Sequence, residues 1–246
     1  MPILAIISDV HGNIDALEAV LADVDAKASE VLCLGDMVGY GAAASECVEL
    51  ISKQCGAIVK GNHEDLTVRL ELDNYPERVA AGIRYAKNTL SQKQIDWLEN
   101  LPLVHVHETN GLFVTLVHAS LKSPEEFAYL STNQEAFLHF QHQTTILCFN
   151  GHTHIPLIVL DEDGCIGWDA PSQRPVRHNN KRRTVVNVGS VGQPRDGDPR
   201  ACYVLFDTDS NVLTFHRVTY DIKRAQERII EAGLPLENAS RLAMGQ

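Results

Sequence analysis

One pattern recurs five times along the chain: a short apolar run ends, and a residue able to bind a metal follows within a few positions. Short apolar runs of this kind are typical of buried strands. In an open α/β sheet, ligands bind beyond the carboxyl ends of the strands, so the pattern predicts one shared crevice lined by Asp, His and Asn. The runs and the residues that follow them are 3–7 with Asp9 and His11, 31–34 with Asp36, 57–59 with Asn62 and His63, 113–117 with His118, and 146–149 with His152 and His154.

Length and charge narrow the class of protein. A chain of 246 residues has room for one large domain or two small ones. Because the candidate ligands run from Asp9 to His154, we expect a single domain over 1–246, with a helical segment at about 64–101. The net charge of −11 argues against extended nucleic-acid binding. It leaves a small phosphate substrate open, since bound metal ions are often the largest local charges in a site.

The cysteines and the apolar runs indicate where the protein works. The six cysteines form no Cys-x-x-Cys pair, and a disulfide framework is unusual in a chain of this size and pattern. We see no signal peptide, and no apolar run approaches the roughly 20 residues that cross a bilayer. We therefore expect a reducing cytoplasm and no membrane association.

The first sixty residues predict alternating strands and helices. Asn13 is a good N-cap for a first helix, and a second helix is expected over 43–54. Alternating βα units favour parallel strands with right-handed crossovers. Residues 64–101 have a helical pattern throughout, and this segment could pack on the sheet or overhang the crevice as a partial lid.

Strands dominate from residue 103 onward. A helix near 131–142 interrupts them, residues 169–183 read as a loop, and a helix over 222–232 closes the unit. The expected strands lie near 103–107, 112–117, 145–149, 156–160, 184–188, 201–206 and 211–218.

The site motifs, taken in order, resemble those of one family. They are Asp9-Val10-His11, Gly35-Asp36, Gly61-Asn62-His63-Glu64, His118 and Gly151-His152-Thr153-His154. Each is weak alone, but their order and glycines are similar to those of the calcineurin-like metallophosphoesterase superfamily. The resemblance covers residue 3 to about 206 and indicates a bacterial cytoplasmic member. It implies an α/β fold, a four-layer α-β-β-α sandwich of two mixed sheets flanked by helices.

The donor set suits two divalent or trivalent metal ions. Carboxylate, imidazole and amide oxygen ligands are typical of Mn, Fe, Zn or Ni sites, and the cysteine placement excludes an all-thiolate site. Alternate residues of an extended segment point the same way, so both histidines of 152–154 can face one cavity. By the resemblance, Asp36 bridges the ions; Asp9, His11 and His154 complete one site, and Asn62, His118 and His152 complete the other.

Two further residues are catalytic candidates by the same resemblance. His63 would protonate the leaving oxygen or stabilise the transition state; alternatively, it orients Asn62. Arg195 follows a strand in the glycine-rich segment 187–198, and such a loop could place a guanidinium on phosphate oxygens. The alternative is a surface turn with a solvated arginine. The remaining histidines are not part of these motifs and are expected to be structural or solvated: His105, His107, His139, His142, His178 and His216.

One departure from the family pattern bears on the substrate. Serine/threonine phosphoprotein phosphatases continue their Gly-Asp-x-Val motif with Asp-Arg-Gly, whereas here Gly39-Tyr40-Gly41 follows. The carboxylate that would orient His63 and the phosphate-holding arginine are both absent there, and Arg195 is a candidate replacement. This difference argues against a dedicated phosphoprotein phosphatase.

The sequence therefore predicts a metal-dependent phosphoester hydrolase, phosphatase-like, that uses a dinuclear centre and a bridging hydroxide on a small phosphoester. One alternative is a phosphodiesterase acting on nucleotides or other diesters. Another is a non-catalytic scaffold on the same fold, against which the complete ligand set and His63 argue. No oligomeric state follows from the sequence.

Overall fold

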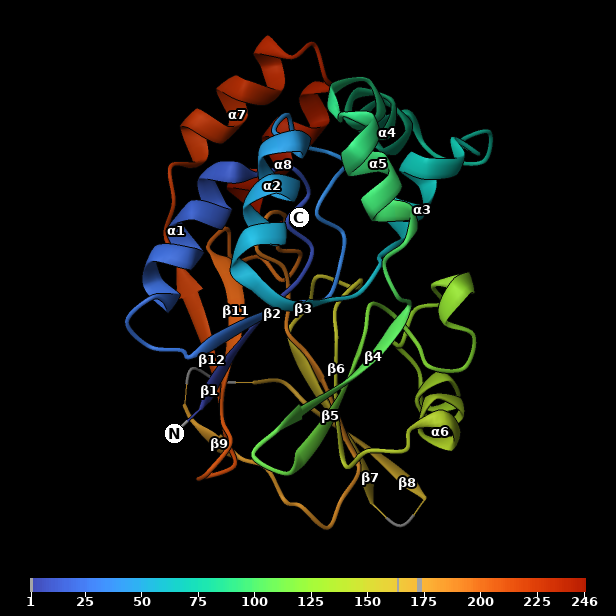
Figure 1. Cartoon of the computed structure of the whole chain (residues 1–246), viewed down its shortest axis with the longest axis vertical. Helices are drawn as coiled ribbons and strands as arrows, with labels where there is room; N and C mark the ends of the chain where they lie inside the picture. The colour runs from blue at the N-terminus through green and yellow to red at the C-terminus, as the bar shows by residue number, and fades with distance from the viewer. Residues whose placement is uncertain (1, 163, 172–173) are drawn as a thin grey trace.

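The computed structural model describes residues 2–162, 164–171 and 174–246. Within these residues, the strands form two sheets of six strands each. Most helices gather at one end of the molecule, while α6 (Asn133–His142) lies beside the second sheet (Figure 1). A single 3-10 turn spans Pro124–Glu126.

The first sheet is mixed, in the order β3-β2-β1-β11-β12-β9. Strands β1, β2 and β3 are parallel, and β11, β12 and β9 add antiparallel neighbours. The three parallel strands confirm the βα units predicted for the first sixty residues. The strands are β1 (Ile3–Ile7), β2 (Glu30–Cys33), β3 (Cys55–Ile58), β9 (Val176–Arg177), β11 (Ala201–Asp207) and β12 (Val212–Val218).

The second sheet is also mixed, in the order β4-β5-β6-β10-β7-β8. Strands β5, β6 and β10 are parallel, and the other neighbours are antiparallel. The strands are β4 (Val104–Thr109), β5 (Leu112–Val117), β6 (Leu147–Asn150), β7 (Leu157–Glu162), β8 (Cys165–Asp169) and β10 (Thr184–Asn187).

Side-chain alternation along the strands builds the layers. In β1, Leu4 and Ile6 enter the core between the two sheets, while Ala5 and Ile7 pack toward the helices α1 and α2. A third cluster joins the outer face of the second sheet to α6 through Phe140. The predicted α-β-β-α sandwich of two mixed sheets is therefore confirmed. Helices α1 and α2 span Ile14–Val24 and Ala44–Gln54. The last two helices of the chain are α7 (Ile222–Glu231) and α8 (Leu236–Met244).

The prediction of helix throughout 64–101 is wrong for 70–76. Helix α3 (Asn62–Arg69) ends where Leu70 adopts a left-handed backbone with φ of 58°, and Pro76 is the N-cap of α4 (Glu77–Thr89). Helix α5 (Gln92–Glu99) completes the segment. Helix α5 packs on the core through Leu98, and the start of α4 lines the candidate site. Whether the segment acts as a partial lid stays a prediction.

Three elements were missed in the second half of the chain. Strand β8 pairs with β7, and two-residue β9 falls in the predicted loop 169–183, of which positions 172 and 173 lie outside the described residues. The helix over 222–232 does not close the unit, because α8 follows it. Short edge strands give weak periodicity, and their pairing partners come from elsewhere in the chain. Helix α8 is amphipathic but only nine residues long.

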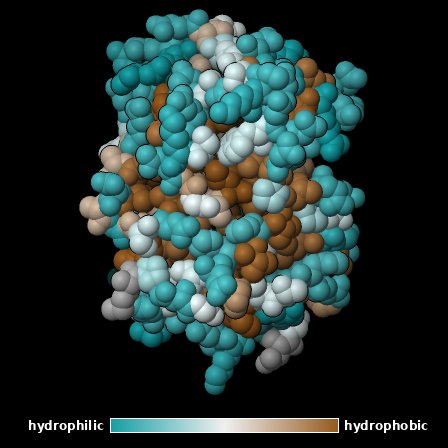
Figure 2. Space-filling view, in the orientation of Figure 1, coloured by the Kyte–Doolittle hydropathy of each residue, from teal (hydrophilic) through white to brown (hydrophobic). Residues whose placement is uncertain are grey.

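The surface, the helices and the cysteines have the following features. Figure 2 shows hydrophobic residues gathered across the middle of one face, below a largely hydrophilic upper part. In the part of the chain that the structure describes, no helix is long and apolar enough to cross a membrane. All six cysteines are free, as predicted. Asn13 caps α1, since its Oδ1 accepts a hydrogen bond of 3.1 Å from the Ala16 N–H.

Candidate functional site

Strained backbone at the strand ends turns the candidate ligands toward one another. Five of them have positive φ, a conformation that is uncommon for residues other than glycine and that clusters at functional sites. Backbone hydrogen bonds hold the loops after β1 and β2 together, from Asp9 N–H to Gly35 O at 3.0 Å and from His11 N–H to Asp36 O at 2.9 Å. The five φ angles are 55° at Asp9, 52° at His11, 54° at Asp36, 67° at His152 and 61° at His154.

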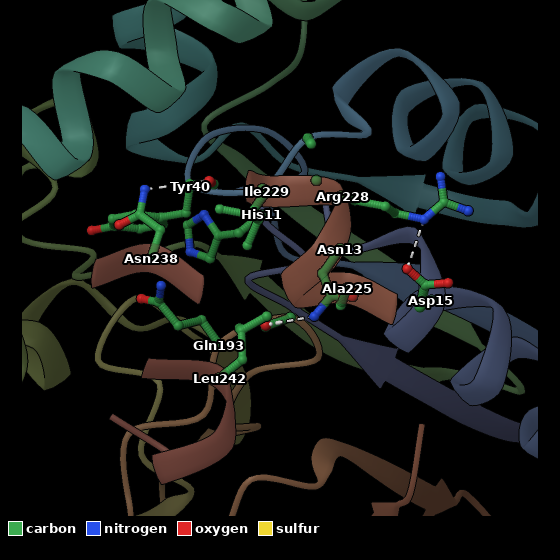
Figure 3. Close-up of a pocket in the computed structure, with 14 residues that line it drawn as sticks. His11, Asn13, Asp15, Tyr40, Gln193, Ala225, Arg228, Ile229, Asn238 and Leu242 are labelled. Carbon is green, nitrogen blue, oxygen red and sulfur yellow. Dashed lines mark hydrogen bonds and ion pairs between the residues drawn. The ribbon is translucent and has the colours of Figure 1, made fainter. Parts of the chain in front are cut away.

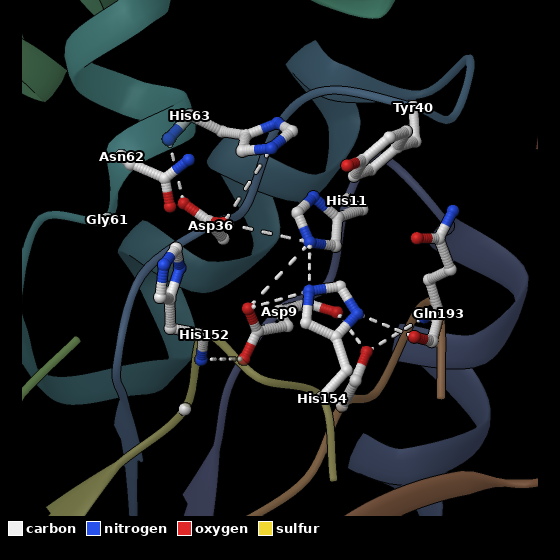
Figure 4. Close-up of polar contacts among 12 residues, drawn as sticks. Asp9, His11, Asp36, Tyr40, Gly61, Asn62, His63, His152, His154 and Gln193 are labelled. Carbon is white, nitrogen blue, oxygen red and sulfur yellow. Dashed lines mark hydrogen bonds and ion pairs between the residues drawn. The ribbon is translucent and has the colours of Figure 1, made fainter. Parts of the chain in front are cut away.

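The first group of candidate ligands consists of Asp9, His11, Asp36 and His154, all of them buried. Their ligand atoms lie within 4.8 Å of one another, a spacing that could hold one metal ion. The Nε2 atoms of His11 and His154 are 3.1 Å apart, and His154 Nε2 lies 3.2 Å from Asp9 Oδ1. Figure 4 shows these side chains converging from separate loops.

The second group consists of Asp36, His118 and His152. His118 Nε2 lies 3.4 Å from Asp36 Oδ2 and 3.1 Å from His152 Nδ1. The side-chain oxygen of Asn62, at the start of α3, lies 3.1 Å from the same His118 nitrogen. Asp36 thus belongs to both groups, and the structure brings together all seven residues that the sequence singled out as ligands.

The hydrogen bonds behind the histidine rings define which nitrogen faces the site. A carbonyl oxygen only accepts hydrogen bonds, so a ring nitrogen beside one must carry the proton. Nδ1 of His11 lies 3.1 Å from Val38 O, and Nδ1 of His118 lies 2.8 Å from Leu34 O. His154 Nδ1 likewise lies 2.6 Å from the carbonyl of Gln193. The neutral rings of His11 and His154 therefore direct their Nε2 lone pairs at each other, and that of His154 also lies beside the Asp9 carboxylate. Such a cluster of acceptors suits bound cations.

The pKa shifts agree with a cluster that lacks counter-charge. Burial lowers the pKa of His152 to about 3 and that of His11 well below its usual value. Burial opposes ionisation of Asp36, but His118 outweighs it and lowers the pKa of Asp36 well below its usual value. For His118, burial is likewise outweighed by Asp36, which raises the pKa of the ring to about 10. His118 and Asp36 thus form a buried ion pair in which each favours the charged form of the other.

Glu64 is a site residue to which sequence reasoning gave no role. It is fully buried at the third position of α3, and its carboxylate accepts N–H bonds from Asp36 and Met37 at 2.7 Å, from Gly61 at 2.8 Å and from Val38 at 3.3 Å. Burial and then the Asp36 charge raise its pKa to about 7, while these N–H groups oppose the shift. Glu64 therefore fixes the loop that presents Asp36. The sequence signal that could have indicated it is its position three residues after Gly61, where a glutamate side chain can accept the N–H of the N-cap residue.

His63 lies beside both groups without belonging to either. Its backbone N–H donates to Asp36 Oδ1 at 2.8 Å, and its Nε2 lies 4.0 Å from Asp36 Oδ2. Its ring packs against His11 and Tyr40, with centroids 4.6 and 4.8 Å away. The structure assigns no hydrogen bond to its Nδ1 among the described residues, and a Cβ at Gly39 would lie 2.1 Å from that atom. The Gly39 position thus has no room for an acidic side chain in this arrangement.

Arg195 lines a cavity beside the two groups of candidate ligands. A cavity of about 200 Å³ adjoins the two groups, and Arg195 and His63 are among its lining residues. The Arg195 guanidinium donates to Gln193 Oε1 at 2.9 Å and to the Tyr40 hydroxyl at 3.3 Å. Its backbone N–H donates to His154 O at 3.2 Å. These contacts place Arg195 at the cavity, and its role there stays a prediction.

The cavity also contains residues that the sequence did not indicate. Tyr129 stacks on the His152 ring with centroids 4.3 Å apart, and Arg78 and Arg241 reach the cavity from α4 and α8. No motif marks them, because they come from elements far apart in the sequence. The histidines expected to be structural or solvated lie outside both metal-ligand groups. His139, for example, lies on α6 and accepts a hydrogen bond of 3.2 Å from the Leu121 N–H.

Comparison with known proteins agrees with this geometry. A model of the calcineurin-like phosphoesterase superfamily domain matches residues 2–211. An uncharacterized protein of Methanocaldococcus jannaschii is 35% identical over 247 residues, covering 99% of this chain and 98% of its own length. The crystal structure of a metallophosphoesterase from Sphaerobacter thermophilus is 38% identical, with a TM-score of 0.88 over 100% of this chain and 99% of that one. A hypothetical protein from Pyrococcus horikoshii shares the fold, with a TM-score of 0.81 at 20% identity and coverage of 100% and 99%.

The chain therefore belongs to the calcineurin-like phosphoesterase superfamily. This confirms the resemblance drawn from the motifs and the prediction of a metallophosphoesterase. A bacterial source stays a prediction.

The role of Glu64 in fixing the site loop is testable with Glu64→Gln. A glutamine amide would present N–H groups to backbone donors on one side, leaving buried donors unsatisfied at a cost of about 1–3 kcal/mol or more. We expect the free energy of unfolding, measured in urea, to fall by at least that amount. Glu77→Gln, at an exposed position on α4, is the matched control and should change it by less than about 0.5 kcal/mol. Equal stability of the two variants would contradict the role.

Proposed function

We propose that the protein is a phosphatase-like hydrolase that cleaves a small phosphoester with the help of two metal ions. The observation that supports this most directly is the position of Asp36, which lies in both buried groups of candidate ligands. Two-metal hydrolases need one ligand that bridges ions about 3.5–4 Å apart. Asp36 would be that bridge.

The remaining ligands divide between the two ions. Asp9, His11 and His154 would complete one site, and Asn62, His118 and His152 the other. Their oxygen and imidazole donors suit Mn, Fe, Zn or Ni. When bound, the two ions would lower the pKa of water to supply a hydroxide nucleophile and would neutralise charge on phosphate oxygens.

His63 and Arg195 would act on the substrate. Burial lowers the pKa of His63 to about 4, although Asp36 opposes the shift, so the ring is neutral at pH 7 and keeps one N–H. It would donate a hydrogen bond to the leaving oxygen as negative charge develops there. Arg195, whose Nε has no hydrogen-bond partner among the described residues, would bind a phosphate oxygen.

The cavity favours a small substrate. Its volume of about 200 Å³ is below the roughly 300–1,000 Å³ of drug-sized sites. Because the site draws on residues from Asp9 to Arg241, we further infer that 1–246 act as one domain. The six free cysteines support a reducing cytoplasm as the location.

A phosphoester panel tests the function. With Mn²⁺ present, we expect turnover of p-nitrophenyl phosphate to exceed that of bis(p-nitrophenyl) phosphate. Preference for the diester would select a phosphodiesterase. Absence of turnover in protein that metal analysis shows to be fully loaded would support a scaffold.

The bridging role of Asp36 is tested by Asp36→Asn. The amide lacks the negative charge that two cations need between them, so we expect activity to be nearly abolished and metal content to fall below two ions per chain. Metal analysis by mass spectrometry and the phosphatase assay measure both. Asp96→Asn, at an exposed position on α5, should leave both unchanged. Wild-type rates in Asp36→Asn would remove the bridging role.

The role of His63 is tested by His63→Ala with two leaving groups. Loss of one transition-state donor costs about 10²- to 10³-fold in rate. We expect metal content to be retained and the loss to be larger for an alkyl phosphate than for p-nitrophenyl phosphate, whose leaving group needs little stabilisation. If metal is lost as well, His63 is structural.

Metal binding should depend on pH through His118. Its pKa of about 10 in the metal-free protein means that the ring is protonated at pH 7, whereas a ligand must be neutral. Binding should therefore release about one proton, and affinity should rise about tenfold per pH unit below that pKa. Calorimetry in two buffers of different ionisation enthalpy measures the release. Equal affinity at pH 6 and pH 8 would contradict the assignment.

A further inference from the structure

Three arginines give the candidate active-site cavity a positive wall. Arg78 comes from α4, Arg195 from the loop after β10 and Arg241 from α8. Asp36 is the only carboxylate among the described residues that line this cavity. A chain with a net charge of −11 thus concentrates cationic side chains beside its candidate metal site. The cavity therefore suits an anion with more charge than a single phosphate carries.

Two of these arginines have donors left for a ligand. Arg241 donates through Nε to Gln246 O at 2.8 Å, and within the described ranges its terminal nitrogens make no hydrogen bond. Arg78 Nε lies 3.7 Å from Glu237, which is beyond hydrogen-bonding distance, and the Glu237 side chain is 57% exposed. Such an ion pair is largely screened by solvent. Arg78 is therefore paired only with an exposed carboxylate, which leaves most of its charge available to a ligand.

Asn238 fixes this wall in place. It is fully buried on α8, and its side-chain amide donates to Arg78 O at 2.9 Å and to Tyr40 O at 3.3 Å. Figure 3 shows Asn238 reaching Tyr40 beside His11. Arg241 lies three residues further along, on the same face of the helix. The contact thus holds the arginines of α4 and α8 near each other before any ligand binds, which lowers the entropic cost of binding.

One of the three arginines lies outside the region that the family model matches. The matching family model ends at residue 211, whereas α8 begins at Leu236. The backbone N–H of Gly197 donates to Gly245 O at 3.0 Å, which joins the end of α8 to the loop that presents Arg195. The C-terminal helix therefore adds a charged side chain to a site whose other parts lie within the matched region.

We propose that Arg78 and Arg241 form a subsite for a second phosphate group, so that the substrate is a phosphoester that bears two phosphates. This deepens the proposed function and rests on it. Planar guanidinium groups bind phosphate oxygens through paired N–H bonds, and two of them match the charge of one phosphate. The second phosphate is either adjacent to the first in a phosphoanhydride chain or attached to another carbon of the same molecule.

Nucleotides test the subsite because they keep the base and ribose constant. The Mn²⁺-loaded enzyme is assayed with AMP, with ADP for the chain arrangement, and with adenosine 3′,5′-bisphosphate for the separated one. We expect kcat/KM for one of the two-phosphate compounds to exceed that for AMP. In Arg241→Gln and Arg78→Gln, that preference should fall roughly 10- to 100-fold, mainly through KM, as expected for loss of a charged hydrogen bond.

Arg84→Gln is the matched control for charge. It removes one positive charge from the same helix as Arg78, but its side chain is exposed, pairs with Glu77 and does not line the cavity. Its preference for two phosphates should equal that of the wild type. A uniform fall in kcat/KM for AMP and the two-phosphate compounds in Arg241→Gln would overturn the subsite, as would a wild-type enzyme that does not distinguish them.

Measured nucleotide affinities distinguish failure of the subsite from failure of the proposed function. If the loaded protein hydrolyses no phosphoester, the proposed function fails, and calorimetry then compares the affinity for AMP with that for adenosine 3′,5′-bisphosphate and ADP. Tighter binding of a two-phosphate compound, lost in Arg241→Gln and kept in Arg84→Gln, would still support the subsite. Equal affinities for all three nucleotides would overturn it.

Discussion

The site depends on the convergence of buried carboxylates and histidine nitrogens on one small space. Carbonyl oxygens behind His11 and His154 place the ring protons on the nitrogens that face away from the site, so that their Nε2 lone pairs and the carboxylate of Asp9 face one small space. Such an arrangement is unfavourable without a cation. Strained φ angles at Asp9 and Asp36 add to the cost, and the surrounding sheets must be stable enough to maintain both.

Glu64 and the strand ends satisfy that requirement by different means. The parallel strands of both sheets deliver the ligand loops to one edge, and backbone hydrogen bonds between the loops fix their relative positions. A buried carboxylate at Glu64 then accepts backbone N–H groups around Asp36, which replaces the hydrogen bonds that water would otherwise make. The region that the calcineurin-like phosphoesterase model matches contains these ligand loops and Glu64.

Much of the site could be predicted because its signal is local in sequence. A strand leaves a strong apolar run, and a ligand such as His118 directly follows it, so position and residue type coincide. The two-residue strand β9 was missed because its pairing with β12 stabilises it more than its own pattern does. Helix α8 was missed because it is only nine residues long. The break at 70–76 depends on a left-handed Leu70, which no propensity favours.

The sequence alone determined the order of the site motifs along the chain, the strands that precede them and the presence of glycine rather than an acidic residue at position 39. Those features depend on residue identity and spacing, which are fully written in the chain. Only the tertiary structure decided that Arg195 faces the cavity, that Glu64 holds the Asp36 loop, and that Arg241 reaches the same space from the last helix. These depend on distances between segments up to some two hundred positions apart, which close packing fixes and local pattern does not encode.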